Sequence, residues 1–178
     1  MSDGIETLMG DHRRCEARFD RMRESLGADT SVVRRIIAEL SVHDALESEL
    51  LYPLVEHRLP DGNRLALDSI GEHVKMAQML AEVDRRHPDD PYRHQLLADL
   101  AEDSRRHFAA EEEALLAPLH RLMAPEELAR LDHDLTRARR KAPTRPHPHA
   151  PRFTVGTHIA AATLHPIDRL RDALRRRP

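Results

Sequence analysis

Apolar residues recur at alternating three- and four-residue steps through four long stretches of this sequence, at about residues 5–26, 30–59, 62–87 and 92–123. This spacing places the apolar side chains on one face of an α-helix, so it predicts four amphipathic helices. Only short connections separate the four stretches. Long helices joined by short connections predict an antiparallel, up-down-up-down four-helix bundle.

Helix-breaking and helix-capping residues mark the ends of these stretches and divide the rest of the chain. We expect Thr30 to cap the second helix and Pro118 to bend or fray the last turns of the fourth. A fifth helix is expected over about residues 125–140, because a proline stands at its first helical position. The segment PTRPHPHAP (residues 143–151) is expected to be extended and polyproline-like, and a short amphipathic helix at about residues 167–176 closes the chain.

The chain of 178 residues is long enough for one domain with a tail. Ala, Leu, Arg and Glu dominate while glycine and aromatic residues are scarce, which favours an all-α fold. We therefore expect a four-helix bundle in residues 1–123, an additional helix in residues 124–142, and a proline- and histidine-rich strap with a short terminal helix in residues 143–178.

Composition excludes several classes of function. No apolar run approaches the roughly 20 residues that a membrane span needs, so no membrane association is expected. The N-terminal sequence MSDGIETLMGDH has no basic segment followed by an apolar one, and Cys15 is the single cysteine, so we expect no secretory signal and a cytoplasmic location. The net charge of −3 is near neutral, and the basic end RLRDALRRRP is typical of a solvated helix end, so nucleic acid is not an expected partner.

Each of the four apolar stripes is interrupted by one histidine near the middle of its helix: His12, His43, His73 and His107. In an antiparallel bundle, mid-helix positions of neighbouring helices meet at one level of the core. Two of these histidines are followed four residues later by a glutamate, Glu47 or Glu111, on the same helix face. Beyond the glutamates, the predicted buried face continues through Leu50 and Leu54 in the second helix and through Ala114 and Pro118 in the fourth.

Two carboxylates buried among four imidazoles would be costly without a compensating cation, and a metal removes that cost. The set suits two ions better than one, because glutamates on different helices can bridge, and its mixed nitrogen and oxygen donors are typical of iron or manganese. A single histidine in the core is more often a hydrogen-bonded residue than a metal ligand. Four histidines at the same depth, however, favour a metal site. Cys15 is expected to be a small core residue. The histidines near helix ends or on polar faces are expected to be solvated: His57, His87, His94, His120 and His133.

These motifs together resemble a known family. The set DH at 11–12, HDALE at 43–47, EH at 72–73 and HFAAE at 107–111 is similar to the hemerythrin-like HHE cation-binding domain, with a match over about residues 5–123. The resemblance implies a non-haem diiron centre, oxo- or hydroxo-bridged, in a four-helix bundle. It further implies that Glu47 and Glu111 bridge the two irons. By the same resemblance, His12 and His43 bind one iron, and His73 and His107 bind the other.

The sequence departs from the oxygen-carrying members at one position. They have a second histidine four residues after the one on the third helix, and here that position is Ala77. An iron that lacks one imidazole has an open or water-filled position, which disfavours reversible oxygen storage. The departure favours chemistry with a small oxidant (dioxygen, peroxide or nitric oxide), or iron or redox sensing through a protein partner. The sequence leaves open whether the chain is an enzyme, a sensor or a simple metal-binding module.

The bridging glutamate of the fourth helix has a neighbour that could replace it. Pro53 follows His43 by ten positions, whereas Pro118 follows His107 by eleven, so counting back from the second proline selects Glu112. Counting forward from His107, with a Leu-Leu pair in the matching place, selects Glu111, and this is our prediction.

Overall fold

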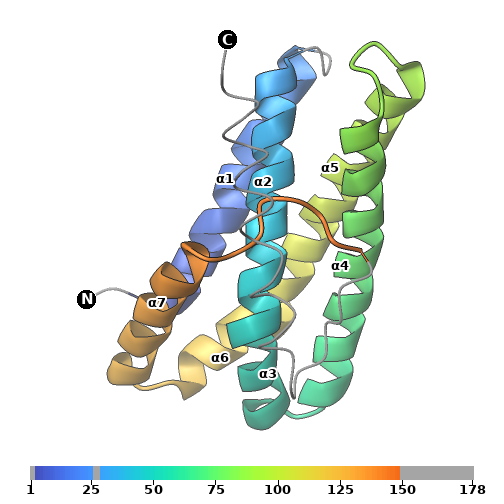
Figure 1. Ribbon diagram of the computed structural model, residues 1–178. Helices are drawn as coiled ribbons and strands as arrows, with labels where there is room; N and C mark the ends of the chain where they lie inside the picture. Colours follow the sequence, from blue (N-terminus) through green and yellow to red (C-terminus); the bar gives the residue numbers. More distant parts are fainter. Residues whose placement is uncertain (1–2, 26–28, 149–178) are drawn as a thin grey trace.

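Helices are the only regular secondary structure in residues 3–25 and 29–148, the part of the chain that the computed structural model describes (Figure 1). The predicted all-α fold is confirmed, whereas the helix expected at residues 167–176 lies outside the described residues. In chain order the elements are α1 (Gly4–Glu24), α2 (Thr30–Leu46), η1 (Glu47–Leu51), α3 (Tyr52–Arg58), α4 (Gly62–Arg85), α5 (Pro91–Glu111), η2 (Glu112–Leu116), α6 (Ala117–Leu122) and α7 (Pro125–Arg139).

The first eight elements form four long antiparallel rods, which are α1, α2–η1–α3, α4 and α5–η2–α6 (Figure 1). The turn between the second and third rods is tight. Asp61 adopts a left-handed conformation with φ 56°, and a side chain at Gly62 would collide with the carbonyl oxygen of Val55. Glycine at this position therefore lets α4 start directly beside the end of α3.

Aspartate residues cap three of the helices. Asp29 precedes α2, and its carboxylate accepts a hydrogen bond from the backbone N–H of Ser31 at 2.8 Å. The prediction that Thr30 caps this helix was wrong, because Thr30 is already the first helical residue and the carboxylate before it satisfies the free N–H groups. Asp3 and Asp90 cap α1 and α5 in the same way.

Each of the two interrupted rods contains one π-helical turn just before a proline. The backbone N–H of Tyr52 bonds to the carbonyl of Glu47, and that of Ala117 bonds to the carbonyl of Glu112, five residues back in both cases. Each turn thus holds one residue more than a regular α-helical turn. The helix continues regularly through Pro118 in α6, so the distortion lies before this proline and not, as predicted, in the turns after it.

The extra residue shifts the buried face of both rods by one position. The predicted face ran through Leu50 and Leu54 in one rod and through Ala114 and Pro118 in the other; these residues are half-buried except Ala114, which is exposed. Instead, the fully buried residues are those one position later: Leu51, Val55, Leu115 and Leu119. The prediction assumed a constant 3.6-residue period, and the π turns break that period.

The core consists of two apolar clusters that lie at different levels along the bundle. One cluster contains Phe19, Ile36, Leu80 and Leu97 among others, and the second contains Ile5, Leu46, Leu51 and Leu116 among others. His12, His43 and His73 fall between the two clusters in the sequence of their helices, and His107 stands directly before Phe108, the last residue of the first cluster in α5. The polar residues of the stripes therefore have apolar packing above and below them.

The additional helix α7 packs along α1 outside the four rods (Figure 1). A side chain at Gly4 would collide with Leu131, and the hydroxyl of Thr7 donates to the carboxylate of Asp132 at 2.5 Å. From α7 the chain runs past α2 to α4, where Arg145 contacts Asp84 at 2.6 Å (Figure 1). In the described part of the chain, no helix is long and apolar enough to cross a membrane.

Candidate metal centre

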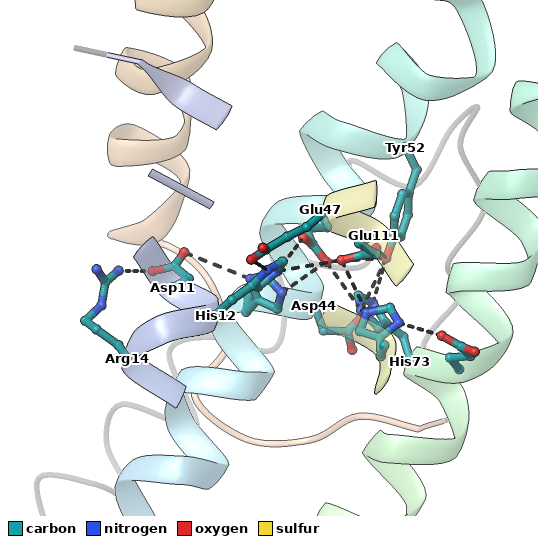
Figure 2. A network of polar contacts seen from close by, with 12 residues as sticks. Asp11, His12, Arg14, Asp44, Glu47, Tyr52, His73 and Glu111 are labelled. Carbon is teal, nitrogen blue, oxygen red and sulfur yellow. Dashed lines mark hydrogen bonds and ion pairs between the residues drawn. The ribbon is translucent and has the colours of Figure 1, made fainter. Parts of the chain in front are cut away.

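The six residues that the sequence analysis singled out lie together at the centre of the bundle. Figure 2 labels His12, Glu47, His73 and Glu111 among them. They come from α1, α2, η1, α4 and α5, and none has a relative exposure above 2%. The set is His12, His43, Glu47, His73, His107 and Glu111.

Their donor atoms form two overlapping groups, and the two glutamates belong to both. The first group consists of the two glutamates with His12 and His43, and the second consists of the two glutamates with His73 and His107. Within each group the donor atoms lie within 4.8 Å of one another. In the second group, the Nε2 atoms of the two histidines are 2.7 Å apart, close enough for both to reach a single cation. Each group could hold a metal ion, and carboxylates that belong to both groups could bridge two ions.

The individual contacts place each glutamate beside histidines of both groups. Glu47 Oε2 lies 3.2 Å from His43 Nε2 and 3.3 Å from His73 Nε2. Glu111 Oε2 lies 3.3 Å from His107 Nε2 and 3.7 Å from His12 Nε2. Both carboxylates therefore lie between the two pairs of imidazoles.

Several ring nitrogens and carboxylate oxygens of these six residues are buried without a hydrogen bond. Within the described residues, His12 Nε2, both ring nitrogens of His43, Glu47 Oε1 and Glu111 Oε2 have no hydrogen-bond partner. A buried polar atom without a partner costs about 1–3 kcal/mol, so several at one point need an explanation. A cation bound by the inward-facing atoms, which are all of these except His43 Nδ1, would remove their cost, and the donor set of nitrogen and oxygen suits such an ion.

A second set of acidic residues surrounds the centre, and we call them the outer carboxylates. Three of them contact the outward Nδ1 atom of a histidine on a neighbouring helix. Glu112 reaches His12 at 2.8 Å, Asp44 reaches His73 at 3.0 Å, and Glu72 reaches His107 at 2.6 Å. The fourth, Asp11, lies 4.0 Å from His43 Nδ1. A carboxylate on Nδ1 leaves Nε2 to face inward, which is how metal-binding imidazoles are commonly oriented.

The outer carboxylates link the four rods in a closed circuit. Asp11 of α1 faces the histidine of α2, Asp44 of α2 faces that of α4, Glu72 of α4 faces that of α5, and Glu112 of η2 faces that of α1. Sequence reasoning missed these roles. Three of the acids stand next to a histidine in the sequence, but each serves the histidine of another helix, so adjacency alone could not assign the pairs.

Glu111 and Glu112 occupy different places. Glu111 lies inside the cluster with 1% of its side chain exposed, whereas Glu112 lies outside it at 34% and contacts the far side of His12. The one-residue difference in spacing to the prolines has a structural reason. The π turn starts at Glu47 in one rod but one residue after Glu111 in the other, and each proline follows the end of its π turn by two residues.

Two further side chains that the sequence analysis did not assign border the centre. The hydroxyl of Tyr52 donates to Glu111 Oε1 at 2.9 Å, and its side chain is fully buried (Figure 2). Phe108 stacks on the imidazole of His12 with a centroid distance of 4.2 Å. The only sequence signal for Tyr52 is its place directly before Pro53, in the segment LLYP at residues 50–53 that follows the first His/Glu pair.

Comparisons with known proteins agree with this geometry. The model of the family "Hemerythrin HHE cation binding domain" matches residues 3–119. This chain belongs to that family. It is also 24% identical over 176 residues to an uncharacterized hemerythrin-like protein of Schizosaccharomyces pombe, covering 97% of this chain and 87% of the relative. No solved structure matched. The predicted resemblance to the HHE family is thus confirmed.

Burial controls the protonation of the site in this HHE domain. Burial raises the pKa of both Glu47 and Glu111 to about 7 and lowers that of His107 to about 4. Burial also lowers the pKa of His43 well below its usual range. For His73 burial acts in the same direction, but the carboxylate of Asp44 and the buried glutamates outweigh it and raise the pKa to about 9.

We expect metal binding to this HHE domain to strengthen as the pH rises from about 6 to about 8. Without metal, Glu47 and Glu111 hold their protons below about pH 7, and a cation must displace them. Protons therefore compete with the metal for these two carboxylates at low pH, and they cease to compete above the pKa of the glutamates. The rise in melting temperature on adding ferrous iron without oxygen should be larger at about pH 8 than at about pH 6. An equal or smaller rise at the higher pH would contradict this.

The remaining candidate residues lie away from the centre. Cys15 is buried, as predicted, and burial raises its pKa to about 12, so the thiol keeps its proton at neutral pH. It lines a cavity of about 320 Å³ between α1, α2 and α7, together with Asp11 and Arg139. The histidines predicted to be solvated are all exposed: His57, His87, His94, His120 and His133.

Proposed function

We propose that this chain is a non-haem diiron protein of the hemerythrin family that binds or turns over a small oxidant, namely dioxygen, peroxide or nitric oxide. The observation that supports the proposal most directly is the pair of overlapping His/Glu groups that share Glu47 and Glu111. His12 and His43 would hold one iron, and His73 and His107 the other. When bound, the two irons supply the redox chemistry with the oxidant.

The donor set fits iron in number as well as in kind. Each group offers two imidazoles and two shared carboxylates, so each ion would have four protein donors. Iron takes up to six donors, which leaves positions for an exogenous ligand, whereas a closed structural zinc site is filled by four. Ala77, one turn after His73 on α4, provides no further donor.

The protein's own residues would prepare the site in three ways. Three of the outer carboxylates, Glu112, Asp44 and Glu72, orient the imidazoles they contact, so that the Nε2 atoms face inward. Tyr52 donates a hydrogen bond to Glu111 and holds its carboxylate in place. Phe108 and the apolar clusters on both sides keep bulk water from the centre, which strengthens the electrostatic interactions inside it.

The expected metal content is about two iron atoms per chain after iron-replete expression, since each His/Glu group provides for one ion. Elemental analysis of protein purified with and without oxygen, together with an optical spectrum, measures it. The control is a double variant. His43→Ala removes a donor from the first group, and Glu47→Ala removes a donor that both groups share. One zinc and no iron in the parent protein would refute the proposal.

The alternative is a non-catalytic sensor of iron, oxygen or redox state that acts through a protein partner. It is supported by the contact between Arg139 of α7 and Asp11 beside the centre, because α7 lies outside the four rods. Peroxide consumption per iron separates an enzyme from a sensor. The cytoplasmic location inferred from the cysteine count stays a prediction.

A further inference from the structure

Asp11 differs from the other outer carboxylates in its partners. Its Oδ2 atom accepts a hydrogen bond from Arg139 of α7 at 2.5 Å, and its Oδ1 atom accepts one from Arg14. Both oxygens of this buried carboxylate are thus engaged by guanidinium groups. Its distance to His43 Nδ1 is 4.0 Å, whereas the three other outer carboxylates lie within 3.0 Å of their histidines.

This difference makes the two groups of the candidate centre unequal. A metal on Nε2 of His43 requires the proton on Nδ1, and within the described residues this buried atom has no hydrogen-bond partner. His73 and His107, in contrast, both have a carboxylate at hydrogen-bond distance from Nδ1. An imidazole with such a carboxylate is the better-oriented and more basic metal ligand.

We propose that Arg139 is a positioning residue that holds Asp11 away from His43, so that α7 weakens metal binding in the group of His12 and His43. This inference rests on the proposed metal centre and adds its regulation: the two positions bind metal unequally, and the additional helix sets the difference. Loss of the contact between Arg139 and Asp11 would alter the weaker position and leave the stronger one unchanged.

Two effects of removing Arg139 act in the same direction. Without this guanidinium, Asp11 Oδ2 is free to approach the Nδ1 atom of His43 and accept its proton. In addition, the guanidinium no longer offsets the negative charge of the Asp11 carboxylate. A more negative carboxylate makes the imidazole of His43 a stronger donor to the metal. Both effects tighten binding in the first group only.

The test is anaerobic titration of the metal-free full chain with ferrous iron, which gives two stepwise dissociation constants. Arg139→Met should lower the larger constant by about tenfold, the lower end of what such partners contribute, and leave the smaller constant within about twofold. In an Asp11→Asn background the same substitution should have no effect, because the carboxylate through which it acts is gone.

Two further variants separate positioning from simple packing. Arg58→Met removes another ion pair that anchors α7, between Arg58 of α3 and Glu127 at 2.5 Å, without touching the centre, and should change neither constant. Arg14→Met releases the other oxygen of Asp11 and should act in the same direction as Arg139→Met, which keeps the test open if Arg139→Met does not fold. NMR of metal-free protein labelled with ¹⁵N-histidine should show a new hydrogen-bonded Nδ1–H signal from His43 in the Arg139→Met variant.

The possible failures are distinguishable. If the parent chain binds no iron, the proposed metal centre fails and this inference fails with it. If the parent binds two irons but Arg139→Met and Arg14→Met leave both constants unchanged, only this inference is overturned. It is also overturned if Arg139→Met acts equally in the Asp11→Asn background, or if Arg58→Met has the same effect.

Discussion

Replacing Glu111 by alanine is expected to lower the bound iron from about two atoms per chain to well below one, because this carboxylate belongs to both groups of donors. Glu47→Ala should have an effect of the same size for the same reason. Glu112→Ala should keep two irons and weaken their binding about tenfold or more, since Glu112 contacts only the outward nitrogen of His12. Glu113→Ala, at an exposed neighbouring position, is the matched control and should behave like the parent.

Iron content after dialysis, measured by elemental analysis, and the optical spectrum of the iron distinguish these variants. Circular dichroism should show that each variant stays helical, because the apolar clusters on both sides of the centre are unchanged. The assignment of Glu111 would be wrong if Glu111→Ala kept its full iron content while Glu112→Ala lost it.

Replacing Ala77 by histidine is expected to slow peroxide decay by at least about tenfold at equal iron loading, which corresponds to about 1.4 kcal/mol in the barrier. Residue 77 is buried on α4, one turn after His73 on the same helix face. An imidazole there would take the proposed open position of the iron that His73 and His107 would hold, whereas the alanine side chain has no donor atom. Stopped-flow measurement of peroxide decay in parent and variant tests this expectation.

Ala77→Leu is the matched control for that experiment, because leucine fills similar space without a nitrogen donor. The leucine variant should keep the iron spectrum of the parent, whereas the histidine variant should change it. If Ala77→His alters neither the decay rate nor the spectrum, residue 77 does not face the metal, and the proposal of an open position fails.

The helices and the six central residues could be predicted from the sequence because both depend on order within one helix. The 3.6-residue period places His43 and Glu47 on one face, and the interruption of each apolar stripe by a histidine marks the same depth in all four helices. The prediction of the buried face failed where the helical period changed. The π turns at residues 47–51 and 112–116 add one residue each, so the buried face moved from Leu50 to Leu51.

Up to the π turns, the sequence by itself determined which side chains enter the core, since burial of a helix face follows from the spacing along a single helix. Only the tertiary structure decided which side chains meet across helices. Asp44 stands next to His43 in the chain but contacts His73, and Asp11 stands next to His12 but faces His43 and Arg139. The physical reason is that these contacts depend on how neighbouring helices are rotated and displaced, which no period within one helix specifies.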